Sequence, residues 1–392
     1  IQYTQEMPPI YGQVVAGPPG SGKTTYCTGM EEYLRLLGRK AFVINLDPAN
    51  EMPKRLANKK QNSDGGEKAE EDNNATALPY EPLLDVCESL VNVTSVMNQL
   101  GLGPNGGLVY CMEYLEAHVE QLVEMIREKV AEHDNPYLLF DLPGQVELYS
   151  HSKAVPRLLE KLVKALDLRL VAIQLIDSHY CTEPANFLSA ALLGTTTMLR
   201  LELPTVSVLS KVDLLTNYGP LPFSFDYFTD CHELDRLLPF LQQGGDFQQD
   251  DDLTRGVDEY YYTDDPDYQA ARRRTRTTPF FRKHEKLHKV LAEVVDEFGL
   301  LSFLPLDISD AGSVGRVLAK IDKCNGYMFI DQKNSKTEDM FRCAVQSDHA
   351  SNYEAIADIE EKLAAARERQ ESENPRQPPS GMNTLFEKEQ LK

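Results

Sequence analysis

The sequence lacks several features that would indicate particular classes of protein. It has no tryptophan, and no apolar run approaches the roughly 18 residues that a membrane-spanning helix needs. Its seven cysteines include no Cys-x-x-Cys pair, which argues against a structural zinc site or a disulfide framework. The N-terminal residues contain neither a basic region nor an apolar core, so no secretory signal is expected. Together these absences favour a cytoplasmic protein with reduced thiols.

An excess of positive charge is also lacking. The 392 residues include 40 lysines and arginines against 61 aspartates and glutamates, for a net charge of −21. A broad basic face that binds nucleic acid without regard to sequence is therefore not expected. We expect neither direct nucleic-acid binding nor a membrane partner.

One short stretch carries specific chemistry. Residues 17–24, Gly-Pro-Pro-Gly-Ser-Gly-Lys-Thr, match the phosphate-binding P-loop pattern at every fixed position. They follow an apolar run at 11–16 and precede a helical pattern at 25–37, which is the context that supports such a match. The backbone N–H groups of the loop are expected to hold phosphates, with the Lys23 ammonium on the terminal phosphates and the Thr24 hydroxyl on Mg²⁺. The residues predicted to bind nucleotide here are Gly20, Ser21, Gly22, Lys23, Thr24 and Thr25.

A second motif, Asp141-Leu-Pro-Gly-Gln145, ends the apolar run 137–140. In P-loop enzymes a carboxylate at this place holds Mg²⁺, so Asp141 is the predicted partner of Thr24. The Gly144 amide is placed to sense a γ-phosphate, and Gln145 is placed like the glutamine that orients attacking water in GTP hydrolases. Glu147 either assists the water or is simply solvated.

A third motif, Ser210-Lys211-Val-Asp213, follows an apolar run at 205–209. An aspartate carboxylate accepts two hydrogen bonds from the guanine N1–H and N2–H₂ groups, which adenine does not offer, and the lysine stem can lie along the base. The pattern favours GTP over ATP, although Ser210 stands where asparagine or threonine is usual. Asp47 ends the run 41–46 and is predicted to lie near Mg²⁺ or the attacking water; the alternative is a turn before a proline.

The rest of the chain alternates short apolar runs with helical patterns, which predicts a mostly parallel, doubly wound α/β sheet in three layers. We expect one P-loop domain over residues 1–330, with disordered insertions near 51–77 and 243–278, and a polar, partly helical tail over 331–392. Further strands are predicted at 168–176 and 301–306. Further helices are predicted at 84–100, 109–133, 154–165, 185–201, 223–241, 279–298, 314–324 and 352–369.

The glycine-rich stretch 101–107 is predicted to be a tight loop between two helices. Within it, Gly103-Pro104-Asn105 presents an amide that can donate a hydrogen bond to a phosphate oxygen. The P-loop has a proline at position 18, where some dimeric P-loop ATPases carry a lysine that reaches their partner. Asn105 could supply a comparable contact, from the same chain or from a neighbour.

These motifs, in this order, resemble those of the GPN-loop GTPases. The resemblance rests on residues 17–24, 46–50, 103–105, 141–147 and 210–213, and the strings around them are similar to the GPN-loop GTPase 2 type. It implies a dimeric, Mg²⁺-dependent GTPase, as a homodimer or as a heterodimer with a paralogue, in which Asn105 reaches the partner's γ-phosphate. It further implies RNA polymerase subunits or assembly factors as partners, and a cytoplasmic protein that can shuttle to the nucleus.

The predicted function is therefore hydrolysis of GTP to GDP and phosphate by a dimeric switch or assembly factor. Two alternatives stay open. One is a GTP-operated chaperone or scaffold in which hydrolysis is only a timer, and the other is an ATP-dependent P-loop ATPase or kinase. The predicted catalytic residues are Lys23, Asp47, Asn105, Gln145 and Glu147.

Overall fold

The computed structural model describes residues 9–49, 78–218, 221–242, 279–327, 352–366 and 369. Both predicted insertions, near 51–77 and 243–278, lie outside the described residues, as does the tail apart from 352–366 and 369. None of the helices in the described ranges is long and apolar enough to cross a membrane.

A seven-stranded sheet forms the centre of the described structure, and all its paired strands run parallel. The order is β3-β2-β4-β1-β5-β6-β7, so the strand before the P-loop lies in the middle. Loops that follow parallel strands gather at the carboxyl edge of the sheet, where ligands bind in such folds. The predicted α/β fold is confirmed. The strands are β1 (Ile10–Ala16), β2 (Lys40–Asn45), β3 (Leu84–Asp85), β4 (Pro136–Asp141), β5 (Leu168–Asp177), β6 (Thr205–Ser210) and β7 (Phe303–Leu306).

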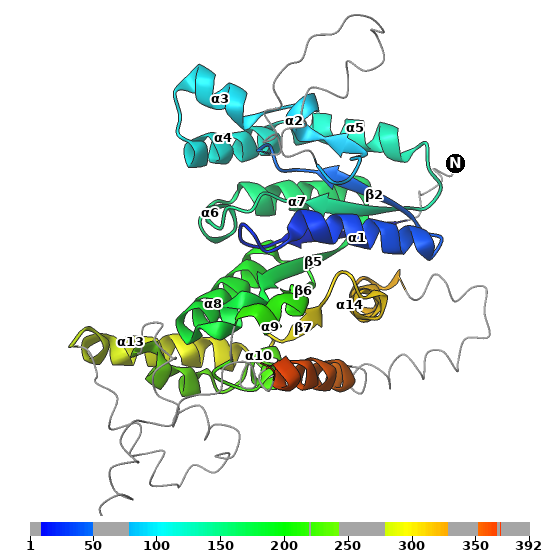
Figure 1. Cartoon of the computed structure of the whole chain (residues 1–392). Coiled ribbons are helices and arrows are strands. Elements are labelled where there is room, and N and C mark those ends of the chain that lie inside the picture. The colour runs from blue at the N-terminus through cyan, green and yellow to red at the C-terminus, as the bar shows by residue number, and fades with distance from the viewer. Residues whose placement is uncertain are drawn as a thin grey trace, which may run out of the picture.

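Helices cover both faces of this sheet and make three layers (Figure 1). Helices α1 and α14 pack on one face, whereas α3, α4, α5 and α7, and then α8 and α10, pack on the other. The α-helices are α1 (Lys23–Leu36), α2 (Val86–Ser89), α3 (Val93–Leu100), α4 (Pro104–Ala117), α5 (Val119–Val130), α6 (Glu147–Ser150), α7 (Ala154–Leu166), α8 (Pro184–Leu201), α9 (Leu215–Tyr218), α10 (Phe225–Asp230), α13 (Pro279–Phe298) and α14 (Ala311–Asn325). The 3-10 helices are η2 (Ser178–Thr182), η3 (Val212–Leu214) and η4 (Leu234–Gln242).

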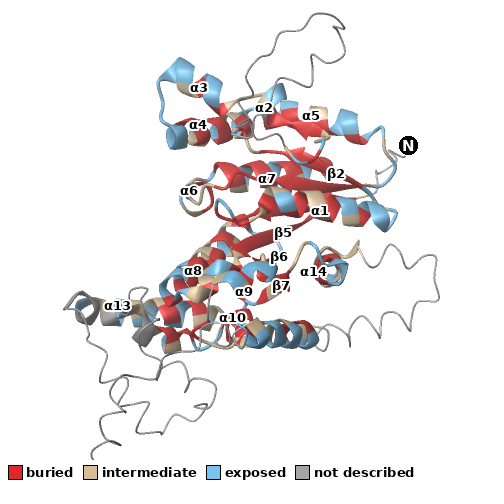
Figure 2. Cartoon of the chain, viewed as in Figure 1, coloured by how far each residue is buried: buried red, intermediate tan, exposed pale blue. Residues whose placement is uncertain are grey.

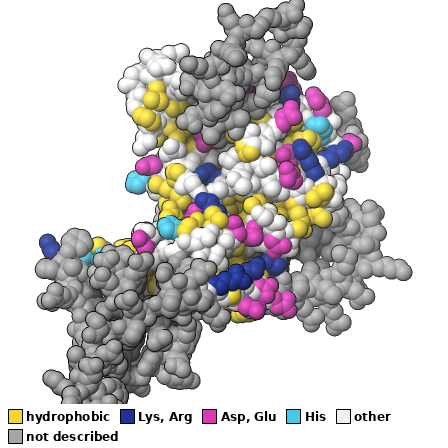
Figure 3. Space-filling model, viewed as in Figure 1, with side chains coloured by type: hydrophobic (Ala, Val, Ile, Leu, Met, Phe, Trp, Pro, Cys, Tyr) yellow, Lys and Arg dark blue, Asp and Glu magenta, His cyan; other side chains and the backbone are white. Residues whose placement is uncertain are grey.

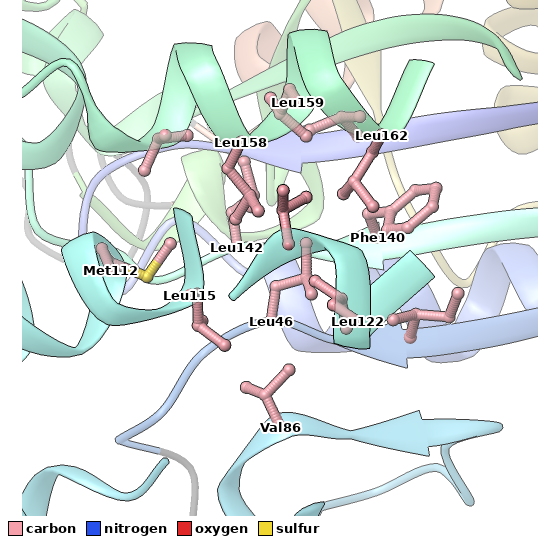
Figure 4. Close-up of a cluster of buried hydrophobic side chains, with 14 of the residues drawn as sticks. Leu46, Val86, Met112, Leu115, Leu122, Phe140, Leu142, Leu158, Leu159 and Leu162 are labelled. Atoms are coloured by element: carbon pink, nitrogen blue, oxygen red, sulfur yellow. The ribbon is translucent and has the colours of Figure 1, made fainter. Parts of the chain in front are cut away.

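The strands are mostly apolar because successive side chains enter opposite helix layers. Val14 belongs to the cluster formed with α4, α5 and α7, whereas its neighbour Val15 belongs to the cluster formed with α1 and α14. Figure 2 shows the burial running through the strands and the inner sides of the helices. Figure 4 shows side chains of the first cluster, among them Leu46, Phe140, Leu142, Met112, Leu115, Leu122 and Leu158.

The single amphipathic helix predicted over residues 84–100 is wrong. Residues 84–85 pair with β2 as the short strand β3, and α2 and α3 follow as separate helices. Each has its own polar N-cap: the Asp85 carboxylate accepts from the Cys87 N–H, and the Asn92 side chain accepts from the Ser95 N–H. These two caps favour new helix starts over a continuous helix.

The prediction that 101–107 forms a loop is wrong for its second half. Helix α4 begins at Pro104, the first helical position, where the missing N–H of proline leaves no helical hydrogen bond unmade. At Gly107 a Cβ would lie 2.9 Å from Met97 Cγ, so glycine lets α3 and α4 pack closely. The helix predicted over 109–133 is likewise two helices, α4 and α5, which meet at His118.

Two further differences lie near β6 and β7. The helix predicted over 223–241 is divided into α10 and η4 by Cys231 and Glu233, which have φ angles of 53° and 56°. The sequence left open where the helical part of the tail would lie. Residues 352–366 form a helix packed on the globule, with Ile356 and Leu363 buried in the same cluster as α8 and α10.

Candidate active site

The P-loop turns sharply between β1 and α1. Gly17 has a φ of 153°, and a Cβ there would lie 2.5 Å from the Leu175 carbonyl oxygen, so only glycine fits. Gly22, the N-cap of α1, is left-handed with a φ of 88°, and no side chain caps the helix. The N–H groups of the first turn of α1 therefore point into the loop, as in sites that bind anions at a helix N-terminus.

Lys23 lies at the centre of this site and is 9% exposed. Burial lowers the pKa of its ammonium group, and the negative charges of Asp141 and Asp47 oppose that shift. Its Nζ donates to the Pro18 carbonyl oxygen at 3.3 Å. A Cβ on Gly144 would lie 2.8 Å from that Nζ, so the Asp141–Gln145 motif packs directly on the P-loop lysine. Lys23, Asp141 and Gly144 are thus brought together as predicted.

Asp141 ends β4 and is 1% exposed. Burial raises the pKa of its carboxyl group to about 6, while hydrogen bonds from the Tyr80 and Thr24 hydroxyls and the charge of Lys23 act in the opposite direction. Tyr80 Oη donates to Asp141 Oδ2 at 2.8 Å. Because Thr24 is among the groups that influence this pKa, the predicted metal pair, Thr24 and Asp141, lies at one place in the site.

The donor set fits Mg²⁺ bound together with a nucleotide. Among the described residues, no group of three or more His, Cys, Asp and Glu side chains could hold a metal ion alone. Mg²⁺ is commonly held by one or two protein oxygens plus substrate phosphates, and Thr24 and Asp141 supply such oxygens beside the P-loop. When bound there, Mg²⁺ would neutralise charge on the phosphates.

Asp47 follows β2 at the same edge of the sheet. Its Oδ1 accepts the Ala49 N–H at 2.9 Å, which is the turn that the sequence offered as the alternative. The charge of Asp47 also influences the pKa values of Lys23 and Asp141. Burial raises the pKa of Asp47. The turn is therefore present, and a role of Asp47 near Mg²⁺ or the attacking water stays a prediction.

The end of β6 is bonded to the P-loop. Ser210 Oγ donates to the Ser21 carbonyl oxygen at 2.8 Å, and Lys211 Nζ donates to the Gly20 carbonyl oxygen at 2.5 Å. Lys211 has a φ of 59° and pairs with Asp177 Oδ2 at 2.7 Å. Asp213, on η3, is exposed, as a carboxylate that receives a base must be. The proposed base segment is thus held at a fixed place relative to the phosphate loop.

Comparisons with known proteins bear on the family. The family described as "Conserved hypothetical ATP binding protein" matches residues 15–58 and 71–327. GPN-loop GTPase QQT1 of Arabidopsis thaliana is 40% identical over 362 residues, which cover 92% of this chain and 100% of that protein. GPN-loop GTPase 2 of Danio rerio is 40% identical over 338 residues, with coverages of 86% and 88%. The chain belongs to the GPN-loop GTPase family.

One further relative and one solved structure are more distantly similar to this chain. GPN-loop GTPase 2 of Saccharomyces cerevisiae is 33% identical over 319 residues, with coverages of 81% and 75%. A GTPase of Pyrococcus abyssi, solved in apo form, shares 21% identity at a TM-score of 0.48 and covers 80% of this chain and 97% of that chain. The expectation of a GPN-loop GTPase is confirmed by the sequence relatives; the roles of single residues stay predictions.

The loop after which the family is named lies apart from the P-loop residues. Residues 101–106 are all exposed, at the corner where α3 meets α4. Figure 1 shows this corner projecting on the side of the sheet where the P-loop lies. Within the described part of the chain, Asn105 forms no hydrogen bond with Lys23 or Asp141, and the structure does not bring it together with them. Gln145 is half-buried beside Gly144, whereas Glu147 is exposed, which agrees with solvation.

Sequence reasoning missed two residues of this GPN-loop GTPase site. Tyr80 follows the predicted insertion near 51–77, and Asp177 follows the predicted strand at 168–176, but neither was singled out. In the structure Tyr80 bonds Asp141 and Asp177 bonds Lys211. A strand-end position could have suggested Asp177. No sequence pattern indicates Tyr80, because its partner is 61 residues away.

Proposed function

We propose that this chain binds GTP with Mg²⁺ and hydrolyses it to GDP and phosphate. The observation that carries the proposal is the pair of bonds from Ser210 and Lys211 to the P-loop carbonyls. They hold a base-recognition segment and a phosphate loop at one edge of the sheet, where Asp141 and Gln145 also lie. A purine nucleoside triphosphate is the ligand whose base and phosphates match both halves.

Each residue has a role set by its position. The P-loop amides and the Lys23 ammonium stabilise negative charge on the phosphates, and Thr24 and Asp141 supply oxygens for Mg²⁺. Gln145 orients the attacking water and Asp47 lies close enough to the phosphate side to influence it. Because catalysis of phosphoryl transfer rests on positioning and electrostatics, loss of one such contact costs about 10²–10³ in rate.

The test compares GTP and ATP as substrates for wild type, Asp213→Asn and Gln145→Leu. We expect Mg²⁺-dependent phosphate release from GTP, a loss of preference for GTP in Asp213→Asn, and slow hydrolysis with nearly intact GTP binding in Gln145→Leu. Equal use of ATP and GTP by wild type, unchanged in Asp213→Asn, would instead support an ATPase. ATP is included as a substrate because the description of the matching family mentions ATP binding.

We further propose that the working unit is a dimer, either of two such chains or with a paralogue. The α3–α4 corner supports this, because it carries the exposed Asn105 and lies on the side of the sheet where the P-loop lies (Figure 1). The resemblance described above also motivates a role in assembling or importing RNA polymerase II and related polymerases. Capture of polymerase subunits by GTP-locked but not GDP-locked protein would support an assembly factor; equal capture by both would count against a nucleotide-driven switch.

A further inference from the structure

Tyr80 forms a hydrogen bond with Asp141, the carboxylate that is predicted to bind Mg²⁺. Its Oη donates to Asp141 Oδ2 at 2.8 Å, and both residues are buried, at 6% and 1% exposure. A hydrogen bond to a carboxylate in such surroundings is strong because little water competes for it.

We propose that Tyr80 is a positioning residue whose hydroxyl fixes the Asp141 carboxylate in the orientation that would hold Mg²⁺ bound with the nucleotide. An ionised carboxylate only accepts hydrogen bonds, and the Tyr80 hydroxyl occupies its Oδ2 atom. Groups that bond a metal-binding carboxylate from behind orient it, and their loss typically weakens metal binding by 10- to 100-fold.

The phenol ring is itself held in place. Tyr80 belongs to the core cluster that contains Val15, Cys27 and residues of α14, so its ring cannot turn without disturbing packed neighbours. Three residues later, the Leu83 N–H donates to the Val43 carbonyl oxygen at 2.7 Å, which ties the segment to β2. Tyr80 therefore acts as a fixed donor.

The same segment leads to the corner that carries Asn105. Asn45 Nδ2 donates to Asp85 Oδ1 at 3.0 Å, and the Val93 N–H, at the start of α3, donates to the Pro48 carbonyl oxygen at 3.1 Å. The bond from Tyr80 to Asp141 thus links the predicted Mg²⁺ carboxylate to the chain segment that leads to α3. The residue that positions Asp141 therefore lies on this segment and not on the P-loop.

This inference rests on the proposed function, and the experiment separates the two. The release of a fluorescent GDP analogue is measured by stopped flow across a range of free Mg²⁺, with wild type, Tyr80→Phe and Tyr137→Phe. Tyr137 is the matched control, because it is also buried on this face of the sheet and its hydroxyl bonds Gln13 instead of Asp141. All three proteins are first compared by thermal unfolding.

We expect Tyr80→Phe to need about 10-fold more Mg²⁺, or more, for half-maximal slowing of release. Release in EDTA should match wild type, and Tyr137→Phe should match it at every Mg²⁺ concentration. A Mg²⁺ dependence within twofold of wild type overturns the proposal, and so does faster release in EDTA alone. If wild type itself shows no retention by Mg²⁺ or binds no nucleotide, the proposed function fails, and this proposal falls with it.

A second variant pair guards against a folding defect in Tyr80→Phe. In an Asp141→Asn background, adding Tyr80→Phe should change the Mg²⁺ dependence no further, because the group that Tyr80 positions no longer has its charge. Independent, additive effects of the two substitutions would contradict the proposal.

Discussion

At the scale of the residue, burial shifts the pKa values of the charged groups in the site. Lys23 and Asp141 carry opposite charges in nearly solvent-free surroundings, and burial shifts the pKa of each toward its neutral form. Their mutual attraction and the hydroxyls of Tyr80 and Thr24 oppose these shifts. The charges in the phosphate site therefore stabilise one another. We expect single substitutions there to change GTP affinity or the pH dependence of stability.

The first prediction concerns Gly144→Ala. The added methyl group would lie 2.8 Å from Lys23 Nζ and 3.3 Å from backbone atoms of Pro19, so the ammonium must leave its place. We expect GTP affinity to fall about 10-fold or more, which corresponds to about 1.4 kcal/mol or more, when measured by equilibrium titration. In the control Gly194→Ala, on α8, the nearest atom to the new Cβ is Leu301 Cδ1 at 3.5 Å, an ordinary van der Waals contact. Unchanged affinity in Gly144→Ala would show that Lys23 adapts at no cost.

The second prediction concerns the pH dependence of stability in protein free of metal and nucleotide. The pKa of Asp141 is about 6 in the folded state against a usual value of 3.8, so the folded state binds the proton more tightly. Its contribution to stability is therefore fully present below about pH 4 and is lost as pH rises through about 6.

This prediction is tested with Asp141→Asn, which keeps an oxygen for the Tyr80 hydroxyl. We expect wild type to lose about 2 kcal/mol relative to Asp141→Asn between pH 4 and pH 7, measured by urea unfolding at each pH. A difference between the two proteins that does not vary with pH would contradict the raised pKa.

At the scale of the element, the ends of helices decide where function is placed. Two polar caps and a proline at a first helical position convert 84–117 into β3, α2, α3 and α4, and leave the Asn105 corner exposed. The tail helix, residues 352–366, caps the N-terminus of another helix, α10. Glu360 Oε1 accepts from the Phe225 N–H at 3.0 Å, at the start of α10, whose own N-cap Ser224 makes no side-chain cap bond.

The third prediction follows from this cap. Glu360→Ala removes the acceptor for the first turn of α10, so we expect a loss of about 1 kcal/mol in the free energy of unfolding, measured by chemical denaturation. Glu361→Ala changes an exposed neighbour on the same helix and should be nearly neutral. Equal stability of the two variants would mean that the tail helix is held by Ile356 and Leu363 alone.

At the scale of the whole molecule, the position of the α3–α4 corner suggests how two chains would meet. Figure 3 shows acidic and basic side chains interspersed over the visible face of the described residues. The proposed dimer would place Asn105 of one chain at the phosphate site of the other. Such a contribution of one chain to the site of the other can be tested with two variant subunits, each of which lacks a different part of the site.

The fourth prediction is such a mixing experiment. Asn105→Ala keeps its P-loop, and Lys23→Ala keeps its Asn105, so a mixed dimer contains one complete site. We expect the mixture to hydrolyse GTP faster than the sum of the two variants alone, measured by phosphate release after subunits have exchanged. Asn105→Ala mixed with itself is the control. No rescue at any ratio would contradict the contribution in trans.

The sequence alone determined the alternation of strands and helices, the P-loop, the Asp141–Gln145 and Ser210–Asp213 motifs and the family. These follow from local patterns, because a strand that is buried on both faces must be apolar and a phosphate loop needs glycines at fixed spacing. It did not determine where helices break between 84 and 133, since caps compete there with apolar periodicity.

Only the tertiary structure brought Tyr80 to Asp141, Asp177 to Lys211, and Lys211 to the P-loop. Each pair joins residues that are far apart in the chain, and the pairs that involve Lys211 meet because parallel strands end at one edge of the sheet. Tertiary packing also brought residues 352–366 onto the globule. The physical reason is that hydrogen bonds between distant residues depend on how the sheet is assembled, and no local pattern encodes that.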